Sequence, residues 1–106
     1  MELMQLRMFL AVAEEGSVRR GAERVFRTPP AVSIAIHKLE EEVNRPLFAR
    51  LPCGKRVLTP AGEVAMDYAK RLLALHDEAV DAIKRVEVER RVHLPYTKRT
   101  KGRKPK

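Results

Sequence analysis

The segment Thr28-Pro29-Pro30 interrupts two stretches of helical periodicity, and this break restricts the fold more than any other feature of the sequence. Proline is tolerated in the first turn of a helix, because the N–H it lacks would be unpaired there anyway. A threonine directly before that turn is a suitable N-cap. The two prolines are therefore predicted to begin a helix rather than to break one.

Apolar residues at spacings of three and four predict three helices before residue 45. The first covers residues 3–15 and ends at Gly16, which suits a left-handed position. Ser17 is a good N-cap for a second helix over about 18–26. The third helix starts at Pro29, and its expected buried stripe is Val32, Ile36, Leu39 and Val43. Two short helices joined by a tight turn, here about 18–37, are typical of a helix-turn-helix, although an ordinary helical hairpin gives the same pattern.

The period changes after the third helix, and this change favours a β-hairpin over residues 47–58. Leu47 and Phe48 begin an extended segment, the stretch 52–55 has the composition of a turn, and residues 56–58 form the return. Arg50, Lys55 and Arg56 are expected near its tip. The predicted fold class is all-α with a small β-wing: a winged helix-turn-helix over residues 1–59.

A long helix is predicted from Pro60 to about Arg91, roughly 48 Å at 1.5 Å per residue. Alternating steps of four and three residues run from Ala61 along its length and indicate a dimerisation seam. The residues expected in the dimer are Ala65, Tyr68, Leu72, Leu75, Ala79, Ala82 and Val86. The alternative is that this helix only folds back on the winged domain.

The net charge of +8 lies wholly in the last part of the chain, since residues 1–89 carry equal numbers of basic and acidic side chains. The segment 92–106 is basic and contains two prolines and one glycine, and this composition predicts a disordered tail. A second excess of basic residues surrounds the helix-turn-helix: Arg19, Arg20, Arg24, Arg27 and Lys38 stand against the single acid Glu23. Basic clusters of this kind favour a polyanionic partner, and nucleic acid is the first candidate.

Other classes of protein find little support in the sequence. His37, His76 and His93 have no partners at metal-ligand spacing, so we expect neither a metal site nor a cofactor. No catalytic constellation is present, which argues against an enzyme. Cys53 is the single cysteine and cannot form an internal disulfide, and no apolar run is long enough to span a bilayer. A cytoplasmic location without membrane contact is expected.

Several segments together resemble the N-terminal DNA-binding domain of LysR-type transcriptional regulators. They are MELMQLRMFLAVAEEGSVRRGAERV, PPAVSIAIHKLEEEV, RPLFAR and VLTPAGE, and the resemblance covers about residues 1–90. It implies that the third helix enters the major groove of double-stranded DNA, that the wing contacts the backbone or minor groove, and that the helix over 60–91 links two subunits into a homodimer or a tetramer. The residues expected to contact DNA are Arg19, Arg27, Thr28, Pro29, Pro30, Ser33, Ile34, His37, Lys38, Arg50, Lys55 and Arg56.

The chain departs from the family pattern at three positions of the third helix and in its length. Pro29 and Ala35 replace glutamines, and Ile34 replaces a common arginine, so bidentate base contacts are lost there. Ile34 and Pro29 can contact thymine methyl groups, which favours sites containing A·T pairs. The 106 residues have no room for the family's effector-sensing domain, so no small-molecule effector site is expected. A sequence-specific regulator is therefore predicted; the alternative is an interaction protein that pairs through its long helix with full-length relatives and modulates them.

Overall fold

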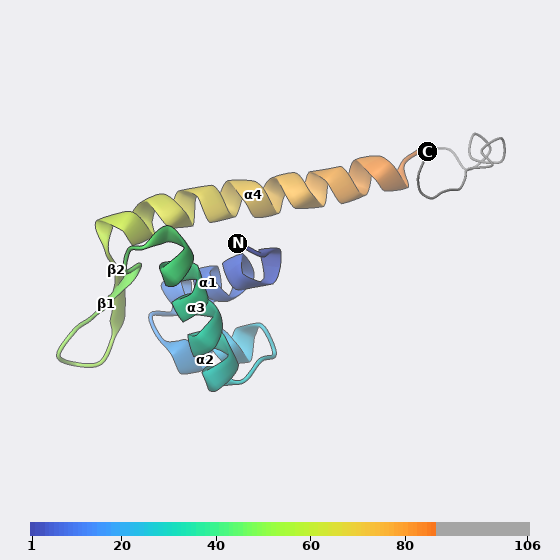
Figure 1. Ribbon diagram of the computed structural model, residues 1–106. Helices are drawn as coiled ribbons and strands as arrows, with labels where there is room; N and C mark the ends of the chain where they lie inside the picture. Colours follow the sequence, from blue (N-terminus) through green and yellow to red (C-terminus); the bar gives the residue numbers. More distant parts are fainter. Residues whose placement is uncertain (87–106) are drawn as a thin grey trace. The chain divides into compact units, whose positions relative to one another are not determined.

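The computed structural model describes residues 1–86 of the protein. The chain divides into two compact units, of which the first is Met1–His76 and the second begins at Asp77. The elements in chain order (Figure 1) are α1 (Leu3–Glu15), α2 (Val18–Arg24), α3 (Pro29–Val43), β1 (Phe48–Arg50), β2 (Arg56–Leu58) and α4 (Pro60–Lys84). The predicted class, helical with a small two-stranded wing, is confirmed. The predicted tail over 92–106 lies outside the described residues.

The corner between α1 and α2 forms as the sequence predicts. Gly16 ends α1 in the left-handed region with φ 71°, and its N–H donates to the carbonyl of Val12 at 2.7 Å. The hydroxyl oxygen of Ser17 then accepts the N–H of Arg20 at 3.2 Å and caps α2. The chain therefore leaves one helix and enters the next within two residues, which keeps the two helices close together.

The start of α3 explains the double proline. The side-chain oxygen of Thr28 accepts the N–H of Ala31 at 3.3 Å, and Pro29 and Pro30 occupy the first turn. Neither proline removes a hydrogen bond there, because the first N–H groups of a helix have no partner within it. At the other end Asn44 takes the left-handed conformation with φ 55° and ends the helix.

The second helix is shorter than the predicted range of about 18–26, because α2 ends at Arg24. Phe26 has φ 58°, in the left-handed region, where a helix cannot continue. The N–H of Arg27 then reaches back to the carbonyl of Ala22 at 3.0 Å. This bond closes the turn of the helix-turn-helix and sets the direction in which α3 begins.

The predicted hairpin is present, and its register pairs Phe48 with Leu58 and Arg50 with Arg56. The first strand begins at Phe48 rather than at Leu47, whose side chain is 1% exposed and belongs to the core. Thr59 fastens the base of the wing, since its N–H donates to the carbonyl of Leu47 at 3.0 Å. The hydroxyl of Thr59 also donates to the carbonyl of Pro46 at 2.7 Å and accepts the N–H of Gly62 at 3.0 Å.

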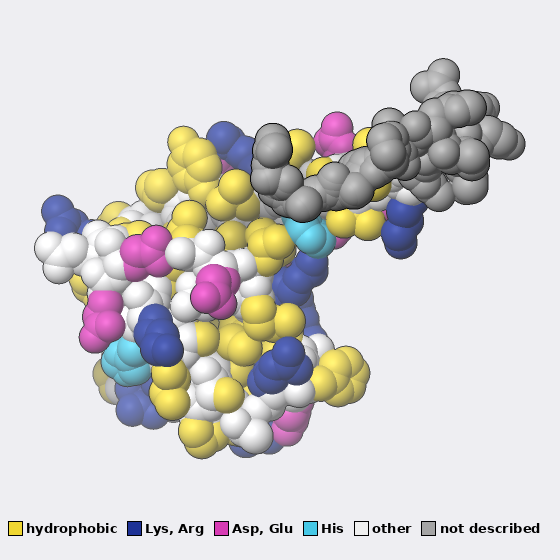
Figure 2. Space-filling model, turned by 45° about the vertical axis from the view of Figure 1, so that its right-hand side comes forward, with side chains coloured by type: hydrophobic (Ala, Val, Ile, Leu, Met, Phe, Trp, Pro, Cys, Tyr) yellow, Lys and Arg dark blue, Asp and Glu magenta, His cyan; other side chains and the backbone are white. Residues whose placement is uncertain are grey.

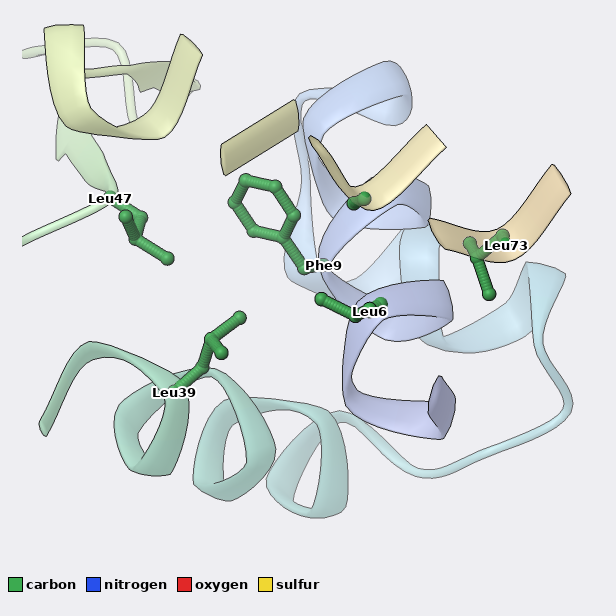
Figure 3. Close-up of a cluster of buried hydrophobic side chains, with 6 residues drawn as sticks. Leu6, Phe9, Leu39, Leu47 and Leu73 are labelled. Carbon is green, nitrogen blue, oxygen red and sulfur yellow. The ribbon is translucent and has the colours of Figure 1, made fainter. Parts of the chain in front are cut away.

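Two apolar clusters form the core of the first unit. In the first cluster, side chains from α1, α3, α4 and the segment before β1 point toward one another (Figure 3); its buried members are Leu6, Phe9, Leu39, Leu47, Ala69 and Leu73. The second cluster joins α1, α2 and α3 through Met8, Val12, Ala22, Val32, Ala35 and Ile36. The ring of Phe48 packs against both, at 5.3 Å from the ring of Phe9. Core packing therefore fixes α3 and the wing on one body.

The long helix ends earlier than predicted. The sequence favours a helix to about Arg91, whereas α4 ends at Lys84, and Val86 lies beyond it. The N–H of Val86 bonds to the carbonyl of Ile83, three residues back, so the last turn tightens and the α-helical ladder stops. Within the first unit, Gly62, Ala69 and Leu73 are the buried residues of α4. The expected stripe of α3 also differs at one end, because Val43 is 42% exposed.

Candidate nucleic-acid interface

One face of α3 is exposed while the opposite face is buried in the core. Val32 and Leu39 are at most 1% exposed, whereas Ile34 is 56% exposed. His37 and Lys38 lie on the same exposed face, and Thr28, Pro29 and Pro30 at the start of the helix are exposed as well. The core thus holds the helix from behind and leaves most of the predicted DNA-contacting residues accessible.

Ser33 and Ala35 are less exposed than Ile34, which lies between them in the sequence. Ser33 is half-buried and lines a hollow of about 230 Å³ between α3 and the wing, together with His37 and Arg56. Ala35 is 9% exposed and packs in the second core cluster. The side chain at position 35 of this protein therefore packs against the core rather than on the exposed face of α3.

The wing carries three cations, of which Arg56 lines the same hollow. Arg50 and Arg56 are directly opposite each other in the strand register, and Lys55 is exposed in the turn between the strands. The turn closes with the N–H of Leu51 donating to the carbonyl of Lys55 at 2.9 Å. The N–H of Arg56 donates to the carbonyl of Gly16 at 3.1 Å, which ties β2 to the corner between α1 and α2.

Part of the basic charge around the helix-turn-helix is neutralised by acids. Arg19 pairs with Glu23 at 3.2 Å on the surface of α2. The guanidinium of Arg24 bridges from α2 to α1, where it donates hydrogen bonds to the carboxylates of Glu14 and Glu15. These bonds, the one to Glu14 first, raise the pKa of the guanidinium. On the face shown in Figure 2, Lys and Arg side chains are interspersed with hydrophobic and acidic ones rather than gathered in a single basic area.

Two of the predicted cations around the helix-turn-helix are not paired with an acidic side chain in the described residues. Arg27 and Lys38 make no ion pair within the described part of the chain, although a guanidinium N–H of Arg27 donates to the carbonyl of Phe26 at 3.4 Å. Among the predicted contacts, Arg27 and Lys38 are therefore better placed than Arg19 to neutralise phosphate.

The structure reveals two residues that the sequence analysis did not single out. Phe26 is 89% exposed in the turn before α3, in a backbone conformation that side-chain-bearing residues rarely adopt. Glu40 accepts the N–H of Leu47 at 2.8 Å and lies 3.8 Å from Nδ1 of His37. The acidic run 40–42 suggests a solvated face, but the side chain of Glu40 is only 21% exposed. The sequence indicates this contact through spacing, because Glu40 follows His37 by three residues in the same helix.

An apolar stripe on α4 is exposed within the first unit. Tyr68, Leu72 and Leu75 are 52%, 37% and 60% exposed, whereas Ala65 is half-buried and packs against the core. The guanidinium of Arg71 lies 4.7 Å from the centre of the Tyr68 ring. The stripe borders an apolar hollow of about 390 Å³; its other walls include Met1, Leu6, Leu39, Val43 and Leu47.

In the second unit the predicted dimerisation residues Ala79, Ala82 and Val86 are exposed. Val86 lies outside the helix, so the helical seam ends before it.

Residues 1–86 contain neither a membrane-spanning helix nor a metal-binding cluster. No helix among them is long and apolar enough to cross a membrane. Within the same residues, no three His, Cys, Asp or Glu side chains are grouped so that they could hold a metal ion. Cys53 is exposed as a free thiol in the turn of the wing.

Comparison with known protein families and curated proteins gives consistent matches. The family described as "Bacterial regulatory helix-turn-helix protein, lysR family" matches residues 3–63. The chain is 44% identical over 81 residues to a probable RuBisCO transcriptional regulator of Cyanidioschyzon merolae, covering 76% of this chain and 26% of that protein. It is 46% identical over 81 residues to the HTH-type transcriptional regulator BudR of Klebsiella aerogenes, covering 76% of this chain and 56% of BudR. The chain thus spans from about a quarter to about half of these relatives.

Solved structures show the same arrangement. The BenM DNA-binding domain in complex with catB site 1 DNA is 37% identical, with a TM-score of 0.76 over 81% of this chain and 94% of that one. The CbnR DNA-binding domain in complex with DNA is 31% identical, with a TM-score of 0.75 over 79% of this chain and 95% of that one. The fold of the described residues is therefore that of domains solved while bound to DNA.

Proposed function

The chain belongs to the LysR family of bacterial regulatory helix-turn-helix proteins, and we propose that it is a sequence-specific DNA-binding regulator of transcription that acts as a homodimer. In this proposal residues 1–59 bind double-stranded DNA in the cytoplasm, and α4 joins two subunits. The observation that carries the proposal is the amphipathic α3, whose buried side is fixed in the core while Ile34, His37 and Lys38 are exposed.

The exposed face of α3 has the chemistry of a major-groove reader. Ile34 and Pro29 offer apolar contact to thymine methyl groups, while the side chain of His37 can hydrogen-bond to base edges. Arg27, Lys38 and the wing cations supply charge for the phosphate backbone, which positions the protein without selecting a sequence. The DNA complexes of the BenM and CbnR domains support this orientation, because their folds match this one closely.

The exposed stripe of α4 supports the proposal of a dimer. Leu72 and Leu75 are large apolar side chains that the first unit leaves accessible, beside an apolar hollow. Burial of such side chains against a second helix contributes about 25 cal/mol per Å² of apolar surface removed from water. A second copy of α4 presents the same stripe and is therefore a self-complementary partner.

Selection of bound duplexes from a random pool tests the DNA-binding part of the proposal. Ile34→Ala should then weaken binding to the selected duplex by about fivefold or more, since a lost base contact costs roughly 1–3 kcal/mol. Binding to random DNA should change little. Ile83→Ala is a matched control, because Ile83 is also an exposed isoleucine, at 70%, but lies near the end of α4. Equal losses of affinity on selected and random DNA would show that Ile34 does not contact bases.

Sedimentation of Leu75→Asp tests the dimer. Leu75 is already 60% exposed in the monomer, so the substitution should leave the helical content unchanged while placing an unpaired charge in the seam. We expect a monomer for Leu75→Asp and a dimer for Ala74→Asp, which adds the same charge one residue away. If the parent protein itself is monomeric, the homodimer is refuted, and pairing with full-length relatives becomes the leading proposal.

A further inference from the structure

Glu40 joins the exposed histidine of α3 to the start of the wing. One carboxylate oxygen, Oε2, accepts the N–H of Leu47 at 2.8 Å, and the other, Oε1, lies 3.8 Å from Nδ1 of His37. The side chain of Glu40 is 21% exposed, whereas that of His37 is 78% exposed. A partly buried acid is thus held in place by the main chain, with its second oxygen toward an accessible imidazole.

The protonation state of His37 decides what its other nitrogen can do. A neutral imidazole has one N–H, so a proton on Nδ1 facing Glu40 leaves Nε2 as an acceptor. A protonated imidazole donates from both nitrogens and can satisfy Glu40 and a DNA acceptor together. Phosphate oxygens and the N7 and O6 atoms of guanine are such acceptors. Nearby DNA, being a polyanion, favours the protonated form as well.

We propose that Glu40 is a positioning residue for DNA recognition: its carboxylate lies within ion-pair distance of Nδ1 of His37, so that Nε2 is left for DNA and DNA binding takes up a proton at His37. The imidazole gains one N–H bond with a proton released by the buffered solvent, and no other covalent bond is made or broken. This inference rests on the proposed function, because it needs α3 to lie against DNA.

Other charged groups around His37 come from both sides of α3. His37 lines the hollow between α3 and the wing that Arg56 also lines, and a shallow hollow shared with Glu41 and Arg45. The two arginines are positively charged, and Glu41 is negatively charged. Glu40 differs from these because it lies within ion-pair distance of the ring and is fixed by the N–H of Leu47.

The test measures affinity for the selected duplex between pH 8 and pH 6 at constant salt. Uptake of one proton changes affinity by at most about tenfold per pH unit. We expect the affinity ratio of the parent protein to His37→Gln to rise about fivefold or more as the pH falls. Calorimetry in buffers of different ionisation enthalpy should show proton uptake by the parent protein and clearly less by His37→Gln.

Two glutamine variants separate positioning from simple charge. Glu40→Gln keeps a side-chain oxygen for the N–H of Leu47 but loses the charge beside His37, so its pH dependence should fall toward that of His37→Gln. Glu41→Gln removes the same charge one residue away, and among the described residues Glu41 makes no ion pair. It should bind somewhat more tightly at every pH and keep the pH dependence.

Distinct outcomes overturn the inference and the proposed function. Parallel pH profiles for the parent protein and His37→Gln would refute proton uptake at His37. A pH profile of Glu40→Gln parallel to that of the parent protein would show that Glu40 has no part in proton uptake and only connects α3 to the wing. If Glu40→Gln is unfolded by circular dichroism, the proton count for His37→Gln still decides proton uptake. Absence of a bound duplex at any pH would instead refute the proposed function.

Discussion

Substitution of Gly62 by alanine should destabilise the first unit, because the start of α4 lies directly against the chain that enters the wing. A Cβ atom at Gly62 would be 2.1 Å from the carbonyl oxygen of Leu47 and 3.0 Å from a methyl group of Leu58. Carbon and carbonyl oxygen normally approach to about 3.3 Å, so the two segments must separate by about 1 Å. The oxygen that would have to move is the acceptor for the N–H of Thr59.

The size of the effect follows from these contacts. Overpacking of a tight site costs about 1–3 kcal/mol, and weakening the Thr59 hydrogen bond adds about 1 kcal/mol. Alanine is favoured over glycine in a helix by up to about 1 kcal/mol, which offsets part of the loss. These terms together give a net loss of about 1–4 kcal/mol, and the middle of that range is about 2–3 kcal/mol. For a domain of this size it lowers the melting temperature by roughly 10–20 °C.

Thermal unfolding followed by circular dichroism measures this change. All variants must be compared at one protein concentration, because association with a second copy would raise the apparent stability. Val64→Ala is the control: it lies two residues further along α4, is 59% exposed, and should change the melting temperature little. An unchanged or higher melting temperature for Gly62→Ala would refute the close approach of α4 and Leu47.

Three further predictions concern α2 and the turn that follows it. Ser17→Ala should lower the free energy of unfolding by about 1 kcal/mol, measured by urea titration, because the hydroxyl caps α2. Phe26→Asn should leave that free energy unchanged or raise it by up to about 1 kcal/mol, since asparagine tolerates φ 58° better than phenylalanine; a clear loss would show that the exposed ring stabilises the fold. Arg27→Gln should reduce the log–log salt slope of DNA binding by about 1, whereas Arg19→Gln should change it less, because Arg19 pairs with Glu23. Equal slopes for these two variants would contradict the assignment of free charge to Arg27.

Local chemistry made the helix starts predictable. Ser17, Thr28 and the prolines act through bonds within three residues of themselves, so the sequence around each contains the whole cause. Helix ends were harder: α2 ends at Arg24 because Phe26 adopts a left-handed conformation, which phenylalanine does not signal. The end of α4 at Lys84 was missed for a related reason, since no glycine or proline marks it.

Contacts between distant segments account for the remaining differences at the candidate site. Periodicity places Ile34 on the exposed side of α3 correctly, but it does not show that Ala35 reaches the second core cluster. The bond from Leu47 to Glu40 spans seven residues and depends on how the chain turns after α3. Neither follows from local spacing, because each depends on where another element lies.

The main-chain attachments of the wing have a consequence for protein engineering. The N–H of Arg56 is bonded to the carbonyl of Gly16, and the N–H of Thr59 to the carbonyl of Leu47. Substitution by any residue other than proline preserves a main-chain donor, so the hairpin remains anchored whatever side chains its tip carries. A Cβ added at Gly54 would meet nothing within 4 Å, but the backbone there has φ 94°, so Gly54 itself should be kept and exchanges made at the other positions of the loop. The loop between the strands is therefore a place where residues can be inserted or their charge changed without moving α3.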